Sequence, residues 1–591
     1  MNNSTLTGKV KTIHILILIF GFLLVFATVR WQAVEASRMS KLARQRSTTS
    51  EINSVRGTIY SSDGTTLAYS EPRFDMFIWV KDLEYYEGLK LQTRDEFLKK
   101  VAPIIDTTPE SLQAKIDEFV NKGVLWAPIA KSLSDEQWNK LTELKAEEFD
   151  TPLRGFQFEN KSKRIYPEKR LASHVVGLTN VVNDKTIGLG GVEESWNEIL
   201  NPIKGILVEE TNAKGEAIAT ALTATIEPKN GSAIHTSINK KLQEIVEQKI
   251  KEGVEKYRAL SGSVTIMDPK TGQIMALANW PDYDPNLREE KDPKAYGNLA
   301  ISSPYEMGSI GKALTISAAV DLDKIDSEKI ILPNGHQGCE KFTDELGPLC
   351  TWDKMPQPAM PVKDCFAKSD NICLFHIAKE YLSKDEFHNY LSKFGIGKST
   401  GVDLAGESYW PLKEASKFNI GDIAAMSYGH GYLVNLVQAV DAMGAIANNG
   451  VRMKPYVVTK VIDSDGNVSE YKPQILDTVI KPETAEKMFY MLNYNYEKSI
   501  YGGEWWYEDL RNYNIGVKSG TALIATEVGY STEINASFVG FDQSPQRTFV
   551  MGIKLERPQL PEGQNLSAYN VRPLWLDTFA AIKDVIGVPR K

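Results

Sequence analysis

Three short motifs that lie far apart in the sequence constrain how this chain can fold. In chain order they are Ser309-Ile310-Gly311-Lys312, Ser369-Asp370-Asn371 and Lys518-Ser519-Gly520-Thr521, which read as S-x-x-K, S-x-N and K-[ST]-G. Together they are typical of a serine acyl-transfer site in which a lysine, and not a histidine, activates the nucleophile. Such a site requires a fold that brings the three motifs together, although Ser369 lies 60 residues after Ser309 and Lys518 lies 149 residues after Ser369.

The first motif lies where a helix should begin. Gly308 precedes Ser309, and the apolar run from Ala313 to Val320 predicts a buried helix. Backbone N–H groups are unpaired at a helix start, so they can contribute to an oxyanion hole. Lys312 follows Ser309 by about one turn and shares its helix face. The alternative for Ser309 is an ordinary helix N-cap, because serine is a preferred cap.

The third motif lies in a predicted strand, residues 513–520, that contains a glycine where another backbone must come close. An extended peptide could pair along this strand by β-addition. Lys518 and the hydroxyls of Ser519 and Thr521 would then face the terminal carboxylate of that peptide. The alternative is an ordinary strand with small residues.

Each motif also has a chance match elsewhere, and local context separates the two. Lys270-Thr271-Gly272 follows Pro269 between two strand-like segments, which predicts a hairpin turn. Ser469 and Lys472 lie in a stretch with strand alternation, where residues three apart point to opposite faces. Ser237-Ile238-Asn239-Lys240 opens a helix but has no ordered partners of the other two types.

Residues 12–29 are nearly all apolar and include no Asp, Glu, Lys or Arg. At ~1.5 Å per residue in a helix they span roughly 27 Å, close to the thickness of a bilayer core. No small-residue cleavage site follows, so we expect an uncleaved signal-anchor with residues 1–11 in the cytoplasm; the alternative is a removed signal peptide. Basic residues after the span favour the reverse orientation, but long domains translocate largely regardless of charge.

The chain as a whole is ordinary in composition, with 24% charged residues and a formal net charge of −8. It contains no basic block suited to nucleic acid. Residues 31–55 are polar and helix-prone, which predicts a stalk. Residues 56–230 mix short strands with charged helical stretches such as Asp95–Val101 and Glu110–Lys122 and contain no motif of reaction chemistry.

The four cysteines all lie between the first motif and just past the second. In an oxidising compartment they allow up to two disulfides in any of three connectivities. Cys339 and Cys350 flank a loop with Gly347-Pro348 and are the favoured pair. Cys365 and Cys373 straddle Ser369, so a bond there would stiffen the second motif.

Two histidines need an interpretation. A zinc site made by His336 with Cys339 and Cys350 is a weaker alternative to the disulfide, since no C-x-x-C spacing exists. His376, on an apolar helix, is interpreted as a core residue with satisfied hydrogen bonds.

The three motifs and several flanking segments resemble the class B penicillin-binding proteins, and the resemblance covers nearly the whole chain. Met307 departs from the family pattern, which usually has proline before Gly-Ser. The absence of proline should loosen the turn slightly, because proline fixes φ. Ser519 replaces the commoner threonine and keeps the hydroxyl. Residues 536–541 resemble the division-specific branch more than the elongation branch. The other matching segments are Arg56–Tyr60, Arg164–Pro167, His174–Asn180, Gly188–Glu193, Phe394–Gly397, Thr400–Glu407, Ser427–Gly431 and Ala445–Val451.

The resemblance implies an α+β fold. We expect residues 231–585 to form a transpeptidase domain of the penicillin-binding and serine β-lactamase type, an antiparallel sheet flanked by helices. An elongated mixed α/β pedestal, of the dimerisation type, would precede it at residues 56–230. A stalk at residues 30–55 and one transmembrane helix at 12–29 would complete the chain.

The resemblance also implies a peptidoglycan D,D-transpeptidase that uses no cofactor and no metal. Ser309 would be the nucleophile, Lys312 its base, and Ser369, Asn371 and Lys518 the other catalytic residues. Ser519, Gly520 and Thr521 would bind substrate. For Lys312 to act as a base it must be neutral, and both burial and the nearby Lys518 cation should lower its pKa.

The expected substrates are peptidoglycan stem peptides, and β-lactams would acylate Ser309. The expected partners are a membrane-embedded glycan polymerase of the SEDS type and divisome proteins, at the cell membrane with the catalytic domain outside the cytoplasm. Two alternatives remain open: a hydrolase of the same fold, either a D,D-carboxypeptidase or a β-lactamase, and a non-catalytic divisome scaffold.

Overall fold

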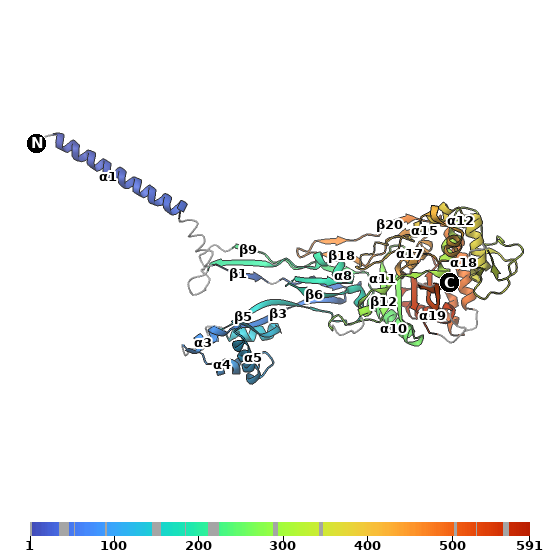
Figure 1. Cartoon of the computed structure of the whole chain (residues 1–591), viewed down its shortest axis with the longest axis horizontal. Helices are drawn as coiled ribbons and strands as arrows, with labels where there is room; N and C mark the ends of the chain where they lie inside the picture. Colours follow the sequence, from blue (N-terminus) through green and yellow to red (C-terminus); the bar gives the residue numbers. More distant parts are fainter. Residues whose placement is uncertain are drawn as a thin grey trace. The chain divides into compact units, whose positions relative to one another are not determined.

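The computed structural model describes residues 3–34, 47–52, 54–88, 92–144, 155–183, 185–210, 224–287, 293–341, 347–500, 505–526, 529–559 and 566–591. It divides into two compact units that are interleaved along the chain. The first unit comprises residues 1–55, 72–162 and 202–230, and the second comprises residues 56–71, 163–201 and 231–591. Both units are drawn in Figure 1, and the motifs all fall in the second.

The N-terminal segment is a single apolar helix, α1 (Asn3–Val29), continued by a short π-helix at Arg30–Val34. Residues 11–32 are long and apolar enough to cross a membrane, a slightly longer stretch than the predicted 12–29. The prediction of a helix-prone stalk is wrong at β1 (Ser47–Ile52), which pairs antiparallel with β8 (Gly205–Glu210). β8 pairs in turn with β9 (Ala224–Ile226).

The helical part of the first unit surrounds a core of its own, with Phe97, Ile116 and Phe156 buried in it. Its helices begin at polar caps: Thr93 and Thr108 each accept a hydrogen bond from a backbone N–H of the first turn, as N-caps do. This confirms the helices predicted near Asp95–Val101 and Glu110–Lys122. The elements are the last residues of β3 (Thr66–Trp79), α3 (Val80–Gly88), α4 (Arg94–Val101), α5 (Pro109–Asn121), β4 (Trp126–Leu133), α6 (Asp135–Glu143) and β5 (Phe156–Ile165).

The second unit is built on a five-stranded antiparallel sheet, in the order β12-β11-β23-β22-β21. The hairpin of β11 (Ser261–Met267) and β12 (Ile274–Trp280) turns at Lys270-Thr271-Gly272, which confirms that this K-[ST]-G match is a turn. β21 (Ile515–Thr526), which carries the third motif, is an edge strand paired with β22 (Gly529–Asp542), and β23 (Val550–Glu556) lies next to β22. An edge strand leaves one side free for an extended peptide.

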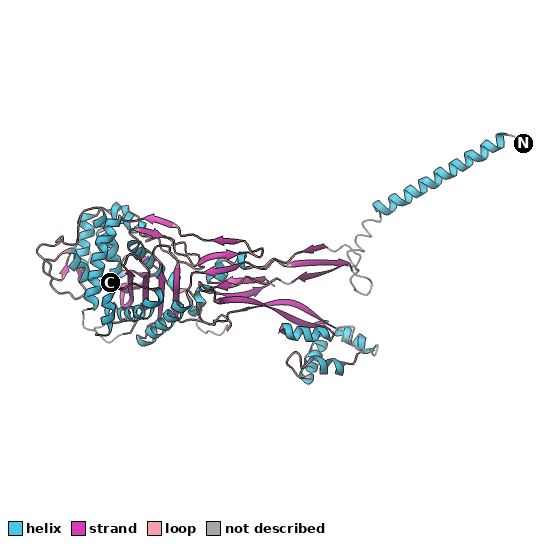
Figure 2. Ribbon diagram, turned by 180° about the vertical axis from the view of Figure 1, so that it is seen from behind, coloured by secondary structure: helices cyan, strands magenta, loops and turns pink. Residues whose placement is uncertain are grey.

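Both faces of this sheet are buried under helices, as the strands between cyan helices in Figure 2 show. One face packs with α10 (Lys240–Lys256) and α19 (Val571–Ile586) around residues such as Val264 and Phe538. The other face packs under α17 (Leu436–Ala447), which is buried along its whole length. This confirms the predicted α+β class with an antiparallel sheet flanked by helices.

Further elements of the second unit complete the surroundings of the motifs. They are β2 (Ile59–Tyr60), α7 (Ser173–Val176), β6 (Leu178–Val182), β7 (Lys185–Leu189), α8 (Gly191–Ser195), α9 (Asn197–Leu200), β10 (Ala233–Thr236), α11 (Leu299–Ser302), β13 (Tyr305–Glu306), α12 (Gly311–Asp321), β14 (Cys339–Glu340), β15 (Leu349–Cys350), α13 (Val362–Ala367), α14 (Asn371–Tyr381), α15 (Lys384–Lys393), α16 (Ile420–Ser427), β16 (Leu433–Val434), β17 (Val451–Met453), β18 (Val458–Ile462), β19 (Val468–Glu470), β20 (Ile475–Thr478) and α18 (Pro482–Ile500). Short 3₁₀ helices lie at Pro293–Tyr296, Gly308–Ile310, Ala415–Lys417, Trp505–Asn512 and Ser567–Tyr569.

Candidate active site

Ser309 lies in a single 3₁₀ turn, Gly308–Ile310, that leads directly into α12. All residues of α12 are buried, which confirms the helix predicted over residues 313–320. Met307 has φ −63°, a value that proline would also adopt, and its side chain is fully buried. The turn therefore keeps the proline-like backbone without the proline ring.

Close backbone contacts hold this turn against the third motif. Gly308 has φ +57°, and a Cβ built on it would meet the carbonyl oxygen of Thr521 at 2.7 Å. On its other side, the N–H of Gly308 donates to the carbonyl of Gly429 at 2.9 Å. A Cβ on Gly520 would meet the carbonyl oxygen of Met307 at 2.5 Å. Because only glycine fits such contacts, the predicted close approach of another backbone to this strand is confirmed at Gly520.

Lys312 is the centre of a hydrogen-bond cluster with the second motif. Its Nζ donates to the carbonyl oxygen of Ser369 at 2.5 Å, to Ser369 Oγ at 3.1 Å and to Asn371 Oδ1 at 2.8 Å. Among the residues that the structure describes, no hydrogen bond joins Lys312 Nζ to Ser309 Oγ. The first two motifs, 60 residues apart at their serines, thus meet through the lysine.

Lys518 brings the third motif to the same serine. Its Nζ lies 3.3 Å from Ser369 Oγ and stands over the ring of Phe366, 5.6 Å from the ring centroid. The Ser369 hydroxyl therefore lies between two lysine amines, and it can accept from one while it donates to the other if one lysine is neutral.

Burial sets the charge state of these lysines. It lowers the pKa of Lys312 well below its usual value, and the nearby Lys518 lowers it further, while Asp370 acts in the opposite direction. Burial also lowers the pKa of Lys518 to about 7. Both causes predicted for Lys312 from the sequence, desolvation and the second lysine, are confirmed.

The second motif is held in a strained loop between α13 and α14. Ser369 has φ +57°, in the left-handed region that a non-glycine residue rarely adopts. Asp370 is the N-cap of α14, since its Oδ1 accepts from the N–H of Cys373 at 2.9 Å. Asn371 Nδ2 donates to the carbonyl oxygen of Cys350 at 2.9 Å.

A loop that precedes α13 braces this motif, and its key side chain was not predicted. His336 Nε2 bonds Asp370 Oδ2 at 2.7 Å, and the N–H of Gly338 donates to His336 Nδ1 at 3.1 Å. Because Nδ1 accepts a hydrogen bond, the ring proton lies on Nε2 and points to the carboxylate. Neither residue forms part of a sequence motif with the other, so spacing alone could not have found this pair.

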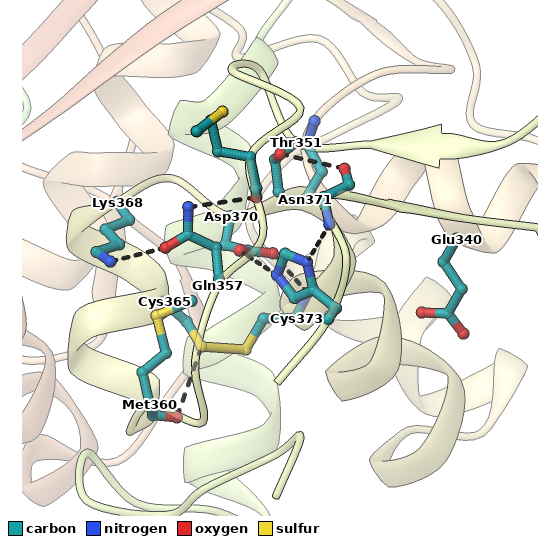
Figure 3. Close-up of polar contacts among 12 residues, drawn as sticks. Glu340, Thr351, Gln357, Met360, Cys365, Lys368, Asp370, Asn371 and Cys373 are labelled. Atoms are coloured by element: carbon teal, nitrogen blue, oxygen red, sulfur yellow. Dashed lines mark hydrogen bonds and ion pairs between the residues drawn. A yellow bond between two sulfur atoms is a disulfide. The ribbon is translucent and has the colours of Figure 1, made fainter. Parts of the chain in front are cut away.

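The favoured cysteine pair, Cys339–Cys350, is a disulfide, and the other two cysteines form a second disulfide, Cys365–Cys373, so one of the three possible connectivities is present. Figure 3 shows Asp370 and Asn371 in one cluster with the Cys365–Cys373 bond. The alternative zinc site is contradicted, since its two cysteines are bonded to each other and His336 is bonded to Asp370. His376 pairs with Glu340 and Glu380, which confirms that its ring nitrogens are satisfied, but the side chain is partly exposed, so the prediction that it lies in the core is wrong.

A serine near the C-terminus was also missed. Thr521 Oγ1 lies 2.8 Å from Ser567 Oγ, and the N–H of Ser567 donates to Thr521 Oγ1 at 3.1 Å. Ser567 Oγ also donates to the carbonyl of Gly520. The hydroxyl predicted to face a substrate carboxylate is therefore engaged within the protein, whereas Ser519 is half-buried beside it.

The chain matches known proteins over both parts that the sequence suggests. Residues 262–574 match the penicillin-binding protein transpeptidase domain, and residues 51–236 match the penicillin-binding protein dimerisation domain. Stage V sporulation protein D of Bacillus subtilis is 25% identical over 553 residues, 92% of this chain and 81% of the relative. Peptidoglycan D,D-transpeptidase FtsI of Escherichia coli is 24% identical over 552 residues, 92% of this chain and 86% of the relative.

Solved structures share the fold. The crystal structure of penicillin-binding protein 2X from Streptococcus thermophilus superposes with a TM-score of 0.75 at 21% identity, over 92% of this chain and 81% of that one. A peptidoglycan synthetase from Bifidobacterium adolescentis gives a TM-score of 0.71 at 22% identity, over 92% of this chain and 98% of that one.

Proposed function

Because this chain belongs to the class B penicillin-binding proteins, we propose that it is a serine-type peptidoglycan D,D-transpeptidase that cross-links stem peptides during synthesis of the septal wall. The observation that carries the proposal is the meeting of all three motifs at Ser369 Oγ, which lies 3.1 Å from Lys312 Nζ and 3.3 Å from Lys518 Nζ. A relative named as a peptidoglycan D,D-transpeptidase supports the reaction, and the resemblance of residues 536–541 to the division-specific branch supports the septal role.

In this proposal Ser309 Oγ attacks the carbonyl between the two terminal D-alanines of a stem peptide. Neutral Lys312 takes the proton of Ser309, after its amine turns from Ser369 toward the nucleophile; catalytic hydrogen bonds often form only in the substrate complex. The backbone N–H groups of Ser309 and Thr521 stabilise the tetrahedral oxyanion. Removal of one such donor typically costs about 2.7–4 kcal/mol of transition-state stabilisation.

Ser369 then relays a proton to the departing D-alanine, and Lys518 keeps its hydroxyl oriented. Asn371, fixed between Lys312 and the Cys350 carbonyl, binds the amide backbone of the substrate. The C–O bond of the acyl-enzyme breaks when an amine of a neighbouring stem peptide attacks and forms the new amide. The donor peptide lies along β21, beside Ser519, Gly520 and Thr521. The terminal carboxylate of the donor peptide displaces Ser567 from the Thr521 hydroxyl.

A β-lactam would acylate Ser309 because it mimics the dipeptide terminus. Intact mass of the full chain with a penicillin should show one adduct, and peptide mapping should place it on Ser309. Ser309→Ala should remove the adduct, whereas Ser237→Ala, in the chance S-x-x-K match, should keep it. An adduct that persists in Ser309→Ala would contradict the nucleophile.

The rate of deacylation distinguishes a transpeptidase from the hydrolases that share its fold. Release of the penicilloyl group within seconds would favour a β-lactamase or carboxypeptidase over a transpeptidase. A wild-type chain that neither forms an adduct nor cross-links stem peptides would favour the non-catalytic divisome scaffold.

We further propose that α1 anchors the chain in the cell membrane with the catalytic unit outside the cytoplasm. The disulfides and the apolar stretch of residues 11–32 support that placement. We keep the domain boundaries 56–230 and 231–585 as a proposal; the dimerisation match at residues 51–236 and the transpeptidase match at residues 262–574 support the order of the two domains. A SEDS-type glycan polymerase and divisome proteins are the proposed partners.

A further inference from the structure

A small open cavity lies beside the second motif and has no role in the mechanism above. Its volume is about 210 Å³. Pockets for drug-sized ligands measure roughly 300–1,000 Å³, so this one suits a single ring rather than a peptide of several residues. We call it the Trp352 cavity, and it is lined by Thr351, Trp352, Asp353, Gln357, Lys368 and Asp370.

The Trp352 cavity adjoins the residue that would pass a proton to the leaving group. Two of its lining residues, Lys368 and Asp370, flank Ser369 in the chain. Trp352 Nε1 donates to the carbonyl oxygen of Lys368 at 3.2 Å, which ties the indole to the same loop. An extended peptide covers about 3.3–3.6 Å per residue, so a stem peptide of a few residues can place its far end in the cavity.

Trp352 gives the cavity an apolar wall. Its side chain is among the most exposed large apolar groups of the described catalytic unit, at 60% exposed. The polar edge of the indole is already satisfied by the Lys368 carbonyl, so the faces of the ring remain for a ligand. A flat apolar face of this kind matches the C–H face of a sugar ring.

Polar side chains surround the indole with both donors and acceptors. Asp353 Oδ1 accepts from Thr351 Oγ1 at 2.9 Å and from the N–H of Met355 at 3.1 Å, whereas its Oδ2 joins no hydrogen bond in the described part of the chain. Lys368 Nζ donates to Gln357 Oε1 at 2.7 Å, as Figure 3 shows. An ammonium group has three donors, so two remain for a ligand.

The charges around the cavity favour a neutral ligand. The Lys368 ammonium repels a cation, and the carboxylates of Asp353 and Asp370 repel an anion. Hydroxyl and amide groups both donate and accept, so they can pair with the carboxylate and with the ammonium. A neutral ring that combines hydroxyl groups, an acetamido group and an apolar C–H face is an N-acetylated sugar.

We propose that the Trp352 cavity binds one N-acetylated sugar residue of the glycan strand to which a stem peptide is attached. The sugar ring stacks on the indole, and Asp353, Gln357 and Lys368 bind its hydroxyl and acetamido groups. This inference rests on the proposed transpeptidase function and extends the substrate that the site recognises from the peptide to its sugar.

Calorimetry on the full Ser309→Ala chain, which should not turn over substrate, tests the proposal in a detergent without a sugar headgroup. The two ligands are a stem peptide that ends in D-alanyl-D-alanine and the same peptide attached to the disaccharide of N-acetylglucosamine and N-acetylmuramic acid. We expect the disaccharide to lower Kd at least about fivefold, as one aromatic contact can. Equal Kd values for the two ligands would overturn the proposal.

Substitutions then locate the gain. Trp352→Ala, added to the same chain, should remove it, whereas Trp352→Phe should keep it because an aromatic face remains. Met355→Ala is the matched control: Met355 is 59% exposed in the same loop and does not line the cavity. A gain that survives in Trp352→Ala would overturn the proposal.

A photoreactive sugar tests the site without any substitution in the cavity, in case Trp352→Ala does not fold. A disaccharide peptide with a diazirine on the acetamido group should cross-link to residues 351–370. Cross-links found only elsewhere in the chain would overturn the proposal. Failure of the proposed function has a different signature, a penicillin adduct that persists in Ser309→Ala, which leaves the sugar cross-link unchanged.

Discussion

At the scale of single residues, the two buried lysines decide how acylation depends on pH. Lys312 must be neutral to take the proton of Ser309, and the nearby Lys518 is one cause of its lowered pKa. As pH falls and Lys312 gains a proton, we expect the rate of penicillin acylation to fall. In Lys518→Met, the midpoint, which is the pH at which the acylation rate is half its maximum, should rise. The substitution removes the second lysine, whose charge lowers the pKa of Lys312.

The chance K-[ST]-G match supplies the matched control. Lys270→Met, in the β11–β12 turn, should leave the midpoint where it is in the wild-type chain. Acylation rates with a fluorescent penicillin, across about pH 5 to 9, measure both variants. A midpoint in Lys518→Met that stays at, or moves below, the wild-type value would contradict the coupling of the two lysines.

His336 acts on the site only through Asp370. In His336→Phe the Asp370 Oδ2 atom, which is buried, loses its partner. A buried acceptor without a partner costs about 1–3 kcal/mol, so we expect a lower free energy of unfolding and slower acylation. His388→Phe, on α15 and outside the site, is the control. Equal stability and equal acylation in His336→Phe and wild type would show that the brace is unimportant.

At the scale of secondary-structure elements, close backbone contacts with β21 hold the turn that carries Ser309, the proposed nucleophile. In Gly308→Ala the new Cβ would meet the Thr521 carbonyl oxygen at 2.7 Å, so the turn must move away from the strand. We expect acylation to fall at least tenfold, because a misplacement of about 1 Å can cost 100-fold in rate. Gly466→Ala is the matched control: it has φ +85° and nothing within 4 Å of the new Cβ.

Both variants pay the cost of a left-handed backbone, about 1–2 kcal/mol. Melting temperatures should therefore fall in both, whereas acylation should fall only in Gly308→Ala. Equal acylation in the two variants would mean that these backbone contacts do not position Ser309.

Elements with a strong local signal could be predicted from the sequence, and contacts between distant segments could not. The apolar run after Lys312 and the Pro-Gly turn at residues 269–272 specify a helix and a hairpin locally, and both are present. The strand at residues 47–52 was missed because its pairing with β8, about 150 residues on, overrides local helix propensity. His336 and Ser567 were missed for the same reason: their partners lie across the fold.

At the scale of the whole molecule, two of the sequence segments that form the second unit are joined by charges buried inside it. Arg56 Nε lies 2.6 Å from Glu193 Oε2, and Arg164 Nε lies 2.7 Å from Glu193 Oε1. The three side chains are at most 5% exposed. One glutamate thus joins two segments of the second unit that are separated in sequence, residues 56–71 and 163–201.

Glu193→Gln should therefore destabilise the fold of this unit and leave its chemistry alone. Two buried guanidinium groups would face a neutral amide, and breaking a buried ion pair costs about 3–5 kcal/mol. Urea unfolding of the full chain in detergent should show a loss of about 3 kcal/mol or more for Glu193→Gln and less than about 0.5 kcal/mol for Glu198→Gln, an exposed residue of α9. Since no hydrogen bond or ion pair within the described part of the chain joins this cluster to the three motifs, the acylation rate of the folded fraction should match wild type. A stable Glu193→Gln chain would mean that the segments at 56–71 and 163–201 are held together without these ion pairs.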